Sequence, residues 1–306
     1  MSARVISGSA VELFLDAGAE LGEGPVWDDR AQELWWVDIS AGRVHRCSPA
    51  GHDRVALQVG EDAGSVALTE TDGTVVVAAG RDLVLLHPAG DTSHLVTVGD
   101  VVRTGVLNDC NCDPAGNLWV GVKTEAETEP IGCLRVVTPS LQVTTVLDAL
   151  TIPNGIDWSP DGRWMYFADS PTLRVDAFPV QDERPGSPRL GSPTTLALAE
   201  PGQGIPDGLT VDSEGAVWVA YWDGWRACRY LPDGTLDTVV EVPVAKVTSC
   251  AFGGEDLREL YVTTAAYELS AAERTAQPAA GGIFRVRVDT PGLPARPSSE
   301  AFRPRT

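Results

Sequence analysis

Six side chains that carry oxygen recur at one point of a repeated sequence pattern. They are Glu23, Ser65, Asn108, Asn154, Asp207 and Thr248. Carboxylate and amide oxygens are the ligands that hard divalent cations prefer, and carboxylates that converge without a cation repel one another. If the fold brings the four acidic or amide groups together, we expect a site for one divalent metal ion.

Each of these residues opens a segment in which an apolar run leads through an acidic turn with Gly into a second apolar run. NDCNCDPAGNLWVGV (108–122), NGIDWSPDGRWMYFA (154–168) and DGLTVDSEGAVWVAY (207–221) are the clearest examples. Turn residues such as D-P-A-G favour a hairpin, and flanking runs rich in Trp, Val and Tyr are typical of strands. The six starting residues are separated by 42, 43, 46, 53 and 41 residues. Repeats of about 40 to 45 residues with four strands are typical of propeller blades.

The sequence therefore predicts an all-β fold, one six-bladed β-propeller with a central metal-binding tunnel. We expect a single domain over residues 1–306, with blades from about residue 12 to 288 and terminal extensions at 1–10 and 290–306. In a propeller the innermost strand of every blade lines the channel. Residues at equivalent repeat positions then lie at equivalent places around the axis, so we expect the six starting residues to form a ring at one mouth of the tunnel.

The chain is strongly acidic, with a formal net charge of −20. Such a protein repels phosphate backbones and anionic headgroups, so we expect neither nucleic acid nor a membrane surface as partner. No stretch has the roughly 18 to 20 apolar residues of a membrane span, and the N-terminus lacks a signal-peptide pattern. The six cysteines are predicted to be reduced, buried thiols of a cytoplasmic protein. A closed propeller leaves few free strand edges, which favours a monomer.

Around these positions the sequence resembles the SMP-30/gluconolactonase/luciferin-regenerating-enzyme family of regucalcin-like six-bladed propellers. The matching segments are LGEGP (21–25), ND (108–109), IPNGIDWSPDG (152–162), GIPDG (204–208) and TSCAFGG (248–254). The resemblance implies that Glu23, Asn154 and Asp207 are the metal ligands. It also implies that Asn108 lies close by and reaches the metal through water or contacts substrate. Family members use calcium, zinc, magnesium, manganese or iron(II), and many hydrolyse aldonolactones.

We therefore predict a metal-dependent hydrolase that opens a small lactone or ester. Asp207 is our choice for the general base, and Asn108 would help to stabilise the developing oxyanion. Sugar-lactone members of the family often carry an arginine two residues before the Asn-Asp pair, where this sequence has Val106; the nearby Arg103 is out of register. Members also place a glutamate where this sequence has Ala126. Both departures count against gluconolactone itself. We expect either a preference for a less hydroxylated or more apolar lactone, or a site that tolerates a broad range of lactones, aldonolactones included.

Loops that join the second and third strands of each blade are expected on the same face as the ring. Lys123 and Glu125 would contact substrate from one such loop, or the run EAETEP (125–130) is simply a solvated loop. Tyr221, Trp222 and Trp225 would form an aromatic wall beside it, although packing at the blade edge accounts equally well for each Trp. The long segment 266–282 is expected on this face as either a lid or a floppy insertion.

Three other functions remain open on this evidence. The same scaffold would serve an organophosphate or aryl esterase, which the aromatic wall and Val106 favour. The same ring would serve a non-catalytic metal-binding regulator. A propeller like strictosidine synthase would need a catalytic glutamate without the metal ring.

Overall fold

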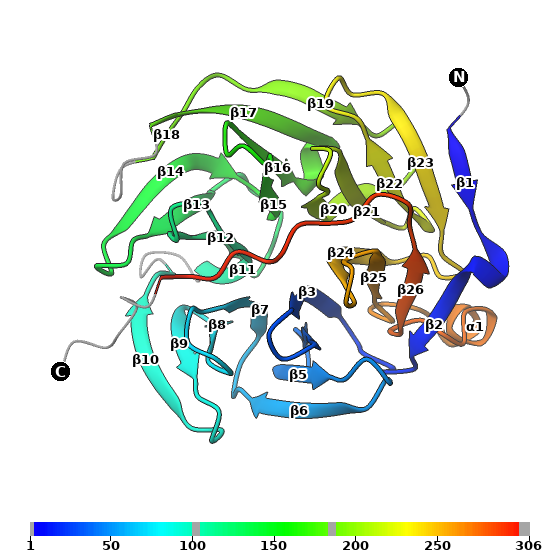
Figure 1. Cartoon of the computed structure of the whole chain (residues 1–306), viewed down its shortest axis with the longest axis horizontal. Coiled ribbons are helices and arrows are strands. Elements are labelled where there is room, and N and C mark those ends of the chain that lie inside the picture. The colour runs from blue at the N-terminus through cyan, green and yellow to red at the C-terminus, as the bar shows by residue number, and fades with distance from the viewer. Residues whose placement is uncertain (1–2, 100–104, 183–187, 300–306) are drawn as a thin grey trace.

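The computed structural model describes residues 3–99, 105–182 and 188–299. Six antiparallel sheets are arranged radially around one axis (Figure 1). The predicted all-β, six-bladed propeller is therefore confirmed.

The first three blades follow one another along the chain, each running from the axis outward. The first blade contains β3 (Gly22–Asp28), β4 (Glu33–Asp38), β5 (Arg43–Cys47) and β6 (Asp53–Gln58). The second contains β7 (Ala63–Leu68), β8 (Val75–Ala79), β9 (Asp82–Leu86) and β10 (Thr92–Thr97). The third contains β11 (Gly105–Cys112), β12 (Leu118–Thr124), β13 (Gly132–Val137) and β14 (Val143–Leu150).

The last three blades differ from the simple four-strand arrangement at their outer edges. The fourth contains β15 (Pro153–Trp158), β16 (Trp164–Asp169) and β17 (Arg174–Asp182), with β18 (Arg189–Leu190) and β19 (Thr194–Leu198) both paired to β17. The fifth contains β20 (Ile205–Val211), β21 (Val217–Trp222), β22 (Arg226–Tyr230) and β23 (Leu236–Glu241). The sixth contains β24 (Val247–Gly253), β25 (Glu259–Thr264) and β26 (Ile283–Arg287).

The two ends of the chain complete these last blades. Strand β2 (Val11–Leu15) pairs with β26 and supplies the fourth strand of the sixth blade, which closes the propeller. Strand β1 (Arg4–Ile6) adds to the fifth blade in parallel with β23. Residues 4–6, predicted as part of a terminal extension, are thus paired within the propeller.

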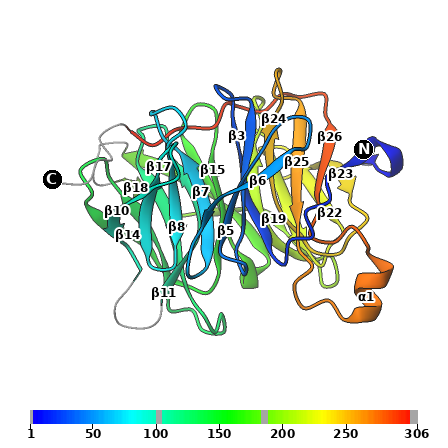
Figure 2. The same ribbon diagram turned by 90° about the horizontal axis from the view of Figure 1, so that it is seen from below.

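The described part of the other predicted extension crosses one face of the molecule. We call residues 289–299 the C-terminal strap. Gly292 N donates to Leu257 O at 2.7 Å, and Ser298 N donates to Leu68 O at 2.8 Å, so the strap reaches from the sixth blade to the second. Figure 2 shows it on the face opposite the short helix α1 (Ala271–Ala276). The strap therefore covers one end of the tunnel.

The turns that the sequence predicts form as tight hairpins held by aspartate. In the third blade Asp113 Oδ1 accepts from the N–H groups of Ala115 and Asn117, both at 2.9 Å. Asp212 repeats this arrangement in the fifth blade, with Glu214 and Ala216 as donors at 3.0 Å. Each aspartate also accepts from the indole N–H of a tryptophan on the following strand. The acidic turns therefore anchor the aromatic core.

The core lies in the wedges between neighbouring blades. Trp119 of the third blade packs edge-on against Trp158 of the fourth, with ring centroids 5.6 Å apart. Trp27 of the first blade stacks on Tyr261 of the sixth at the same separation. All six cysteines are buried and free, as predicted. Within the described ranges, no helix combines the length and the apolar character needed to cross a membrane.

Candidate active site

A bulge interrupts the innermost strand of all six blades at the predicted ring position. In β11 the pairing with β12 jumps from Leu107 to Cys110, so Asn108 and Asp109 stand opposite one residue. The other five inner strands shift register at the ring residue or directly next to it, with Glu23 and Ser65 still paired in the ladder. A bulge turns a side chain away from the regular alternation of a strand. The bulge therefore redirects the four ring residues that it leaves unpaired, which are Asn108, Asn154, Asp207 and Thr248.

Four of the six ring residues line one cavity of about 530 Å³ on the face that carries α1. They are Glu23, Asn108, Asn154 and Asp207. Ser65 donates instead to Cys110 Sγ at 2.7 Å, and Thr248 donates to Gly22 O at 2.5 Å. The expectation that all six would face the axis is wrong for these two, because their hydroxyls are used in contacts between neighbouring blades.

Hydrogen bonds fix the orientation of both ring amides. Asn108 Nδ2 donates to Pro153 O at 2.9 Å, and a carbonyl oxygen can only accept. Ser170 Oγ donates to Pro206 O at 2.7 Å, so it accepts from Asn154 Nδ2 at 3.1 Å. These bonds use one N–H of each amide, so each Oδ1 is available as an acceptor, and the second N–H of each Nδ2 can still donate.

The two ring carboxylates are buried with few partners. Burial raises the pKa of Glu23 to about 8, with the Asp109 charge adding to the effect, while the Gly24 N–H and Lys123 act in the opposite direction. Burial also raises the pKa of Asp207 well above its usual range, and the Glu23 charge contributes. Asp207 Oδ1 is buried without a hydrogen-bond partner. A buried charged oxygen without a partner is costly unless a cation compensates it.

This oxygen set fits a hard divalent cation. Two carboxylates and two amide oxygens from four blades face one cavity, and oxygen donors are what calcium, magnesium and manganese prefer. In the described part of the chain, no three His, Cys, Asp or Glu side chains form a metal-binding group. The fit therefore depends on the amide oxygens of Asn154 and Asn108 joining the two carboxylates.

The residues predicted to bind substrate all line this cavity. Val106 lies directly opposite Lys123 in the β11–β12 register. Lys123 forms an ion pair with Glu127, and Glu125 is exposed beside it. Trp222 lies under Lys246, whose Nζ is 4.2 Å from the centre of the indole ring. Arg103 lies outside the described residues.

The aromatic wall differs from the prediction. Tyr221 is fully buried and its hydroxyl is 2.7 Å from that of Tyr230, so it belongs to the blade core. Trp225 is 46% exposed and lines a separate surface groove. Tyr267, which the sequence reasoning missed, faces the cavity and lies 6.3 Å from Trp222 between ring centroids. Tyr267 is an aromatic residue on a long segment that was expected on the ring face. That was the signal from which its place in the cavity could have been predicted.

Segment 266–282, expected to be a lid or a floppy insertion, is an ordered loop. It contains α1, which begins with a capping box formed by Ser270 and Glu273. Gln277 Oε1 accepts from Ala245 N at 2.6 Å. An ion pair joins Arg274 to Glu20 at 3.0 Å. These contacts hold Tyr267 and Glu268 at the cavity wall, and they rule out the floppy insertion.

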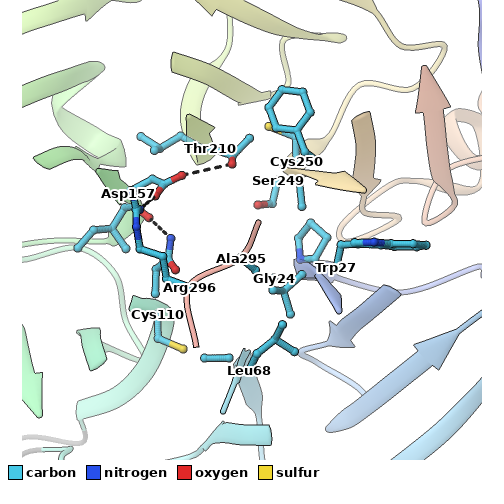
Figure 3. A pocket seen from close by; sticks show the side chains of 18 of the residues that line it. Gly24, Trp27, Leu68, Cys110, Asp157, Thr210, Ser249, Cys250, Ala295 and Arg296 are labelled. Atoms are coloured by element: carbon cyan, nitrogen blue, oxygen red, sulfur yellow. Dashed lines mark hydrogen bonds and ion pairs between the residues drawn. The ribbon is translucent and has the colours of Figure 1, made fainter. Parts of the chain in front are cut away.

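Below the ring, a chamber of about 90 Å³ occupies the other half of the tunnel (Figure 3). The C-terminal strap closes it, and Arg296 Nη1 reaches Asp157 Oδ1 at 3.1 Å. Asp109 also lines the chamber, and burial raises its pKa to about 7. The chamber is too small for a sugar-sized ligand, which leaves the larger cavity as the candidate active site.

Residues 21–266 match the family model described as the SMP-30/Gluconolactonase/LRE-like region. The chain is 34% identical to a 6-deoxy-6-sulfogluconolactonase of Pseudomonas putida, over 89% of this chain and 92% of that protein. It is 34% identical to regucalcin of Gallus gallus, over 90% and 94%. Its fold matches the structure of regucalcin, a calcium-binding protein from Agrobacterium tumefaciens, with a TM-score of 0.89 and 27% identity, covering 97% and 99% of the two chains.

Proposed function

The chain belongs to the SMP-30/gluconolactonase/LRE-like family, and on this premise we propose that it is a divalent-metal-dependent lactonase. One observation carries the proposal. Asp207 Oδ1 is buried without a partner among the described residues, and Asp207 lines a cavity together with three further oxygen-bearing side chains of the ring. In a native structure such an atom points to a catalytic role or to an ion or water that completes it. The relative named as a sulfogluconolactonase supports a lactone as the substrate class.

Glu23, Asn154 and Asp207 would hold the ion, and Asn108 would lie beside it. When bound, the ion would act as a Lewis acid on the ester carbonyl and lower the pKa of water. The two carboxylates and the Asn154 oxygen come from three different blades, so the rigid propeller sets their separation. The propeller would thus position the metal-binding side chains without a flexible loop.

Asp207 is the side chain best placed to accept a proton. Asp207 lines the cavity, and its Oδ1 has no hydrogen-bond partner among the described residues, so its carboxylate would take a proton from the water that attacks the acyl carbon. The acyl C–O bond of the ring then breaks, and the proton passes to the departing alkoxide oxygen to give a hydroxy acid. We therefore assign Asp207 both metal binding and proton transfer.

Asn108 keeps the role that we predicted for it, which is to help to stabilise the developing oxyanion. Its Nδ2 carries two N–H groups, of which one donates to Pro153 O, and the other would be the donor toward the oxyanion. Its Oδ1 is an acceptor, which suits orienting the attacking water or a substrate hydroxyl. Lys123, whose charge acts to lower the pKa of both ring carboxylates and which lines the same cavity, would be the cation near the developing oxyanion.

An assay of sugar lactones, alkyl lactones and phosphotriesters, each with and without EDTA, tests this proposal. We expect lactone hydrolysis that EDTA abolishes and that added calcium, manganese or zinc restores. Hydrolysis of phosphotriesters alone would assign the chain to the esterases. Metal binding by calorimetry without turnover of any substrate would indicate a regulator.

A further inference from the structure

A band of aliphatic side chains lies directly above the oxygen ring. The residues two positions before Glu23, Asn108, Asn154 and Asp207 are Leu21, Val106, Ile152 and Ile205, and all four line the cavity. Four blades therefore present the same arrangement, an aliphatic side chain next to an oxygen ligand. We call these four residues the collar.

The collar offers no hydrogen bond to a substrate. In the second blade the equivalent residue is Ala63, which is also apolar. In the sixth it is Lys246, whose ammonium is paired with Asp223 at 3.0 Å and covered by Trp222. When a substrate binds, its hydroxyl groups that lie against the collar would lose their hydrogen bonds to water. The side chains of the collar would not replace those bonds.

Carboxylates surround the mouth of the cavity. Asp62, Glu125, Glu127 and Glu268 are exposed lining residues on loops of the ring face, and we call them the rim. Burial increases from the exposed rim, through the half-buried collar, to the mostly buried ring, so these are three successive levels of one well.

The well carries a large negative charge. Its described lining contains six carboxylates and one ammonium, Lys123, a net formal charge of −5. A bound divalent cation would leave −3. Asp207 Oδ1, in the ring, is buried and has no hydrogen-bond partner among the described residues. This supports a ligand site, rather than a solvated surface, within the negative charge. Low-dielectric walls concentrate such a field and change the local concentration of charged ligands.

We propose that the collar and the rim select a neutral lactone with few hydroxyl groups, and that they exclude anionic lactones. The proposal rests on the lactonase function and names its substrate class. It also accounts for product release. Hydrolysis converts a neutral ester into a carboxylate, which the rim repels, so the reaction itself creates the charge that drives the product out.

The test compares three δ-lactones of similar size: a neutral alkyl lactone, neutral gluconolactone and a lactone carrying a sulfonate. At low salt we expect kcat/KM for the alkyl lactone to exceed that for gluconolactone. We expect kcat/KM for the alkyl lactone to exceed kcat/KM for the sulfonated lactone by at least about tenfold. This difference should become smaller in ~0.5 M salt, because salt screens exposed charges. Equal rates for neutral and anionic substrates, or a gap that salt does not change, would overturn the charge filter.

Two double variants with the same change in charge assign the effect to the rim. Asp62→Asn with Glu268→Gln removes two rim charges, and we expect it to raise the relative rate on the sulfonated lactone about three- to tenfold. Asp29→Asn with Glu255→Gln removes two exposed charges from turns at the opposite face and should leave that ratio unchanged. If both variants raised the relative rate equally, the net charge of the protein, and not the rim, would discriminate between neutral and anionic lactones.

Val106→Thr with Ile152→Thr tests the collar. The two changes add two hydroxyls, one of them with the loss of a carbon atom at residue 152. They should raise kcat/KM for gluconolactone relative to that for the alkyl lactone by several-fold. An unchanged ratio would remove the collar from the proposal.

Binding separates this proposal from the lactonase function. Calorimetry with the corresponding lactams, in the protein loaded with calcium, compares neutral and sulfonated ligands without turnover. Tighter binding of the neutral lactam supports the filter even if no lactone is hydrolysed. Equal binding contradicts the filter even if lactones are hydrolysed.

Discussion

The two ends of the tunnel partner two buried aspartates differently. At the end covered by the strap, Asp157 accepts from Trp158 N, Val211 N, Thr210 Oγ1 and Arg296. At the other end, one oxygen of Asp207 has no partner among the described residues. Buried charges that serve stability are normally paired. We therefore propose that the unpaired oxygen of Asp207 is kept for a ligand.

A second contrast lies within the fifth blade, between Asp207 and Asp212. Both aspartates are buried and only five residues apart on or next to β20. Asp212 accepts from two backbone N–H groups, from Trp218 and from Arg229 at 2.7 Å. Residue type and burial thus do not distinguish a structural carboxylate from a functional one, whereas the hydrogen-bond partners do.

The largest effect on activity is expected from Asp207→Asn, which is nearly isosteric. Loss of the carboxylate weakens metal binding and removes the proton acceptor, so kcat/KM should fall by about 10³-fold or more. The unfolding free energy of the metal-free protein should not decrease, because an uncompensated buried charge is removed. Lactone assays and urea unfolding in EDTA measure the two effects. Asp157→Asn is the control and should show the reverse pattern, with stability lost and most activity kept.

The largest effect on stability is expected from Asp212→Ala. It removes the one fully buried carboxylate among the three that pair with Arg229, whose side chain is only 7% exposed; the other two, Glu214 and Asp237, are exposed to solvent. It also removes the acceptor of Trp218 and of two backbone N–H groups. We expect a loss of about 3–5 kcal/mol in the free energy of unfolding. The control is Asp161→Ala, which removes an exposed aspartate from the equivalent turn of the fourth blade. It should change the free energy of unfolding by no more than about 0.5 kcal/mol. Similar losses in the two variants would contradict the distinction drawn here.

A smaller, pH-dependent effect is expected from Arg296→Met in the strap. Burial raises the pKa of Asp157, and Arg296 opposes that rise. A carboxyl whose folded pKa is raised holds its proton more tightly in the folded state, so its ionisation destabilises the fold as the pH rises from the unfolded to the folded pKa. Without Arg296 that pKa rises further. The variant should then lose about 1–3 kcal/mol at neutral pH and less at acid pH.

Urea unfolding of both proteins across this pH range, in EDTA, measures the difference. Arg174→Met removes an exposed arginine paired with Asp176 at 3.3 Å on an outer strand and serves as the control. A loss for Arg296→Met that did not change with pH would mean that the arginine acts through packing rather than through Asp157.

The smallest effect is expected from Val106→Arg in the collar. The new guanidinium would lie opposite Lys123 and offer donors to substrate hydroxyls. We expect the ratio of kcat/KM for gluconolactone to that for an alkyl lactone to rise by several-fold. If the ratio did not rise, Val106 would not set the preference, and Lys123 would become the residue to test.

The sequence alone determined the number of blades, the turn chemistry and the position of the ring. Hairpin turns, strand residues and a repeat of about 40 residues are local features, and a closed propeller converts repeat position into position around an axis. For this reason Glu23, Asn108, Asn154 and Asp207 could be predicted to share one cavity, and they do.

The tertiary structure alone decided which ring residues face the cavity and how each end of the tunnel is finished. Ser65 and Thr248 occupy the same repeat position as the others, but their short hydroxyls find partners in neighbouring blades. The strap binds Asp157 through a residue 139 positions away in sequence, and Tyr267 reaches the cavity on a loop outside the repeat. Such contacts depend on which blades become neighbours when the ring closes, and a repeat pattern does not contain that information.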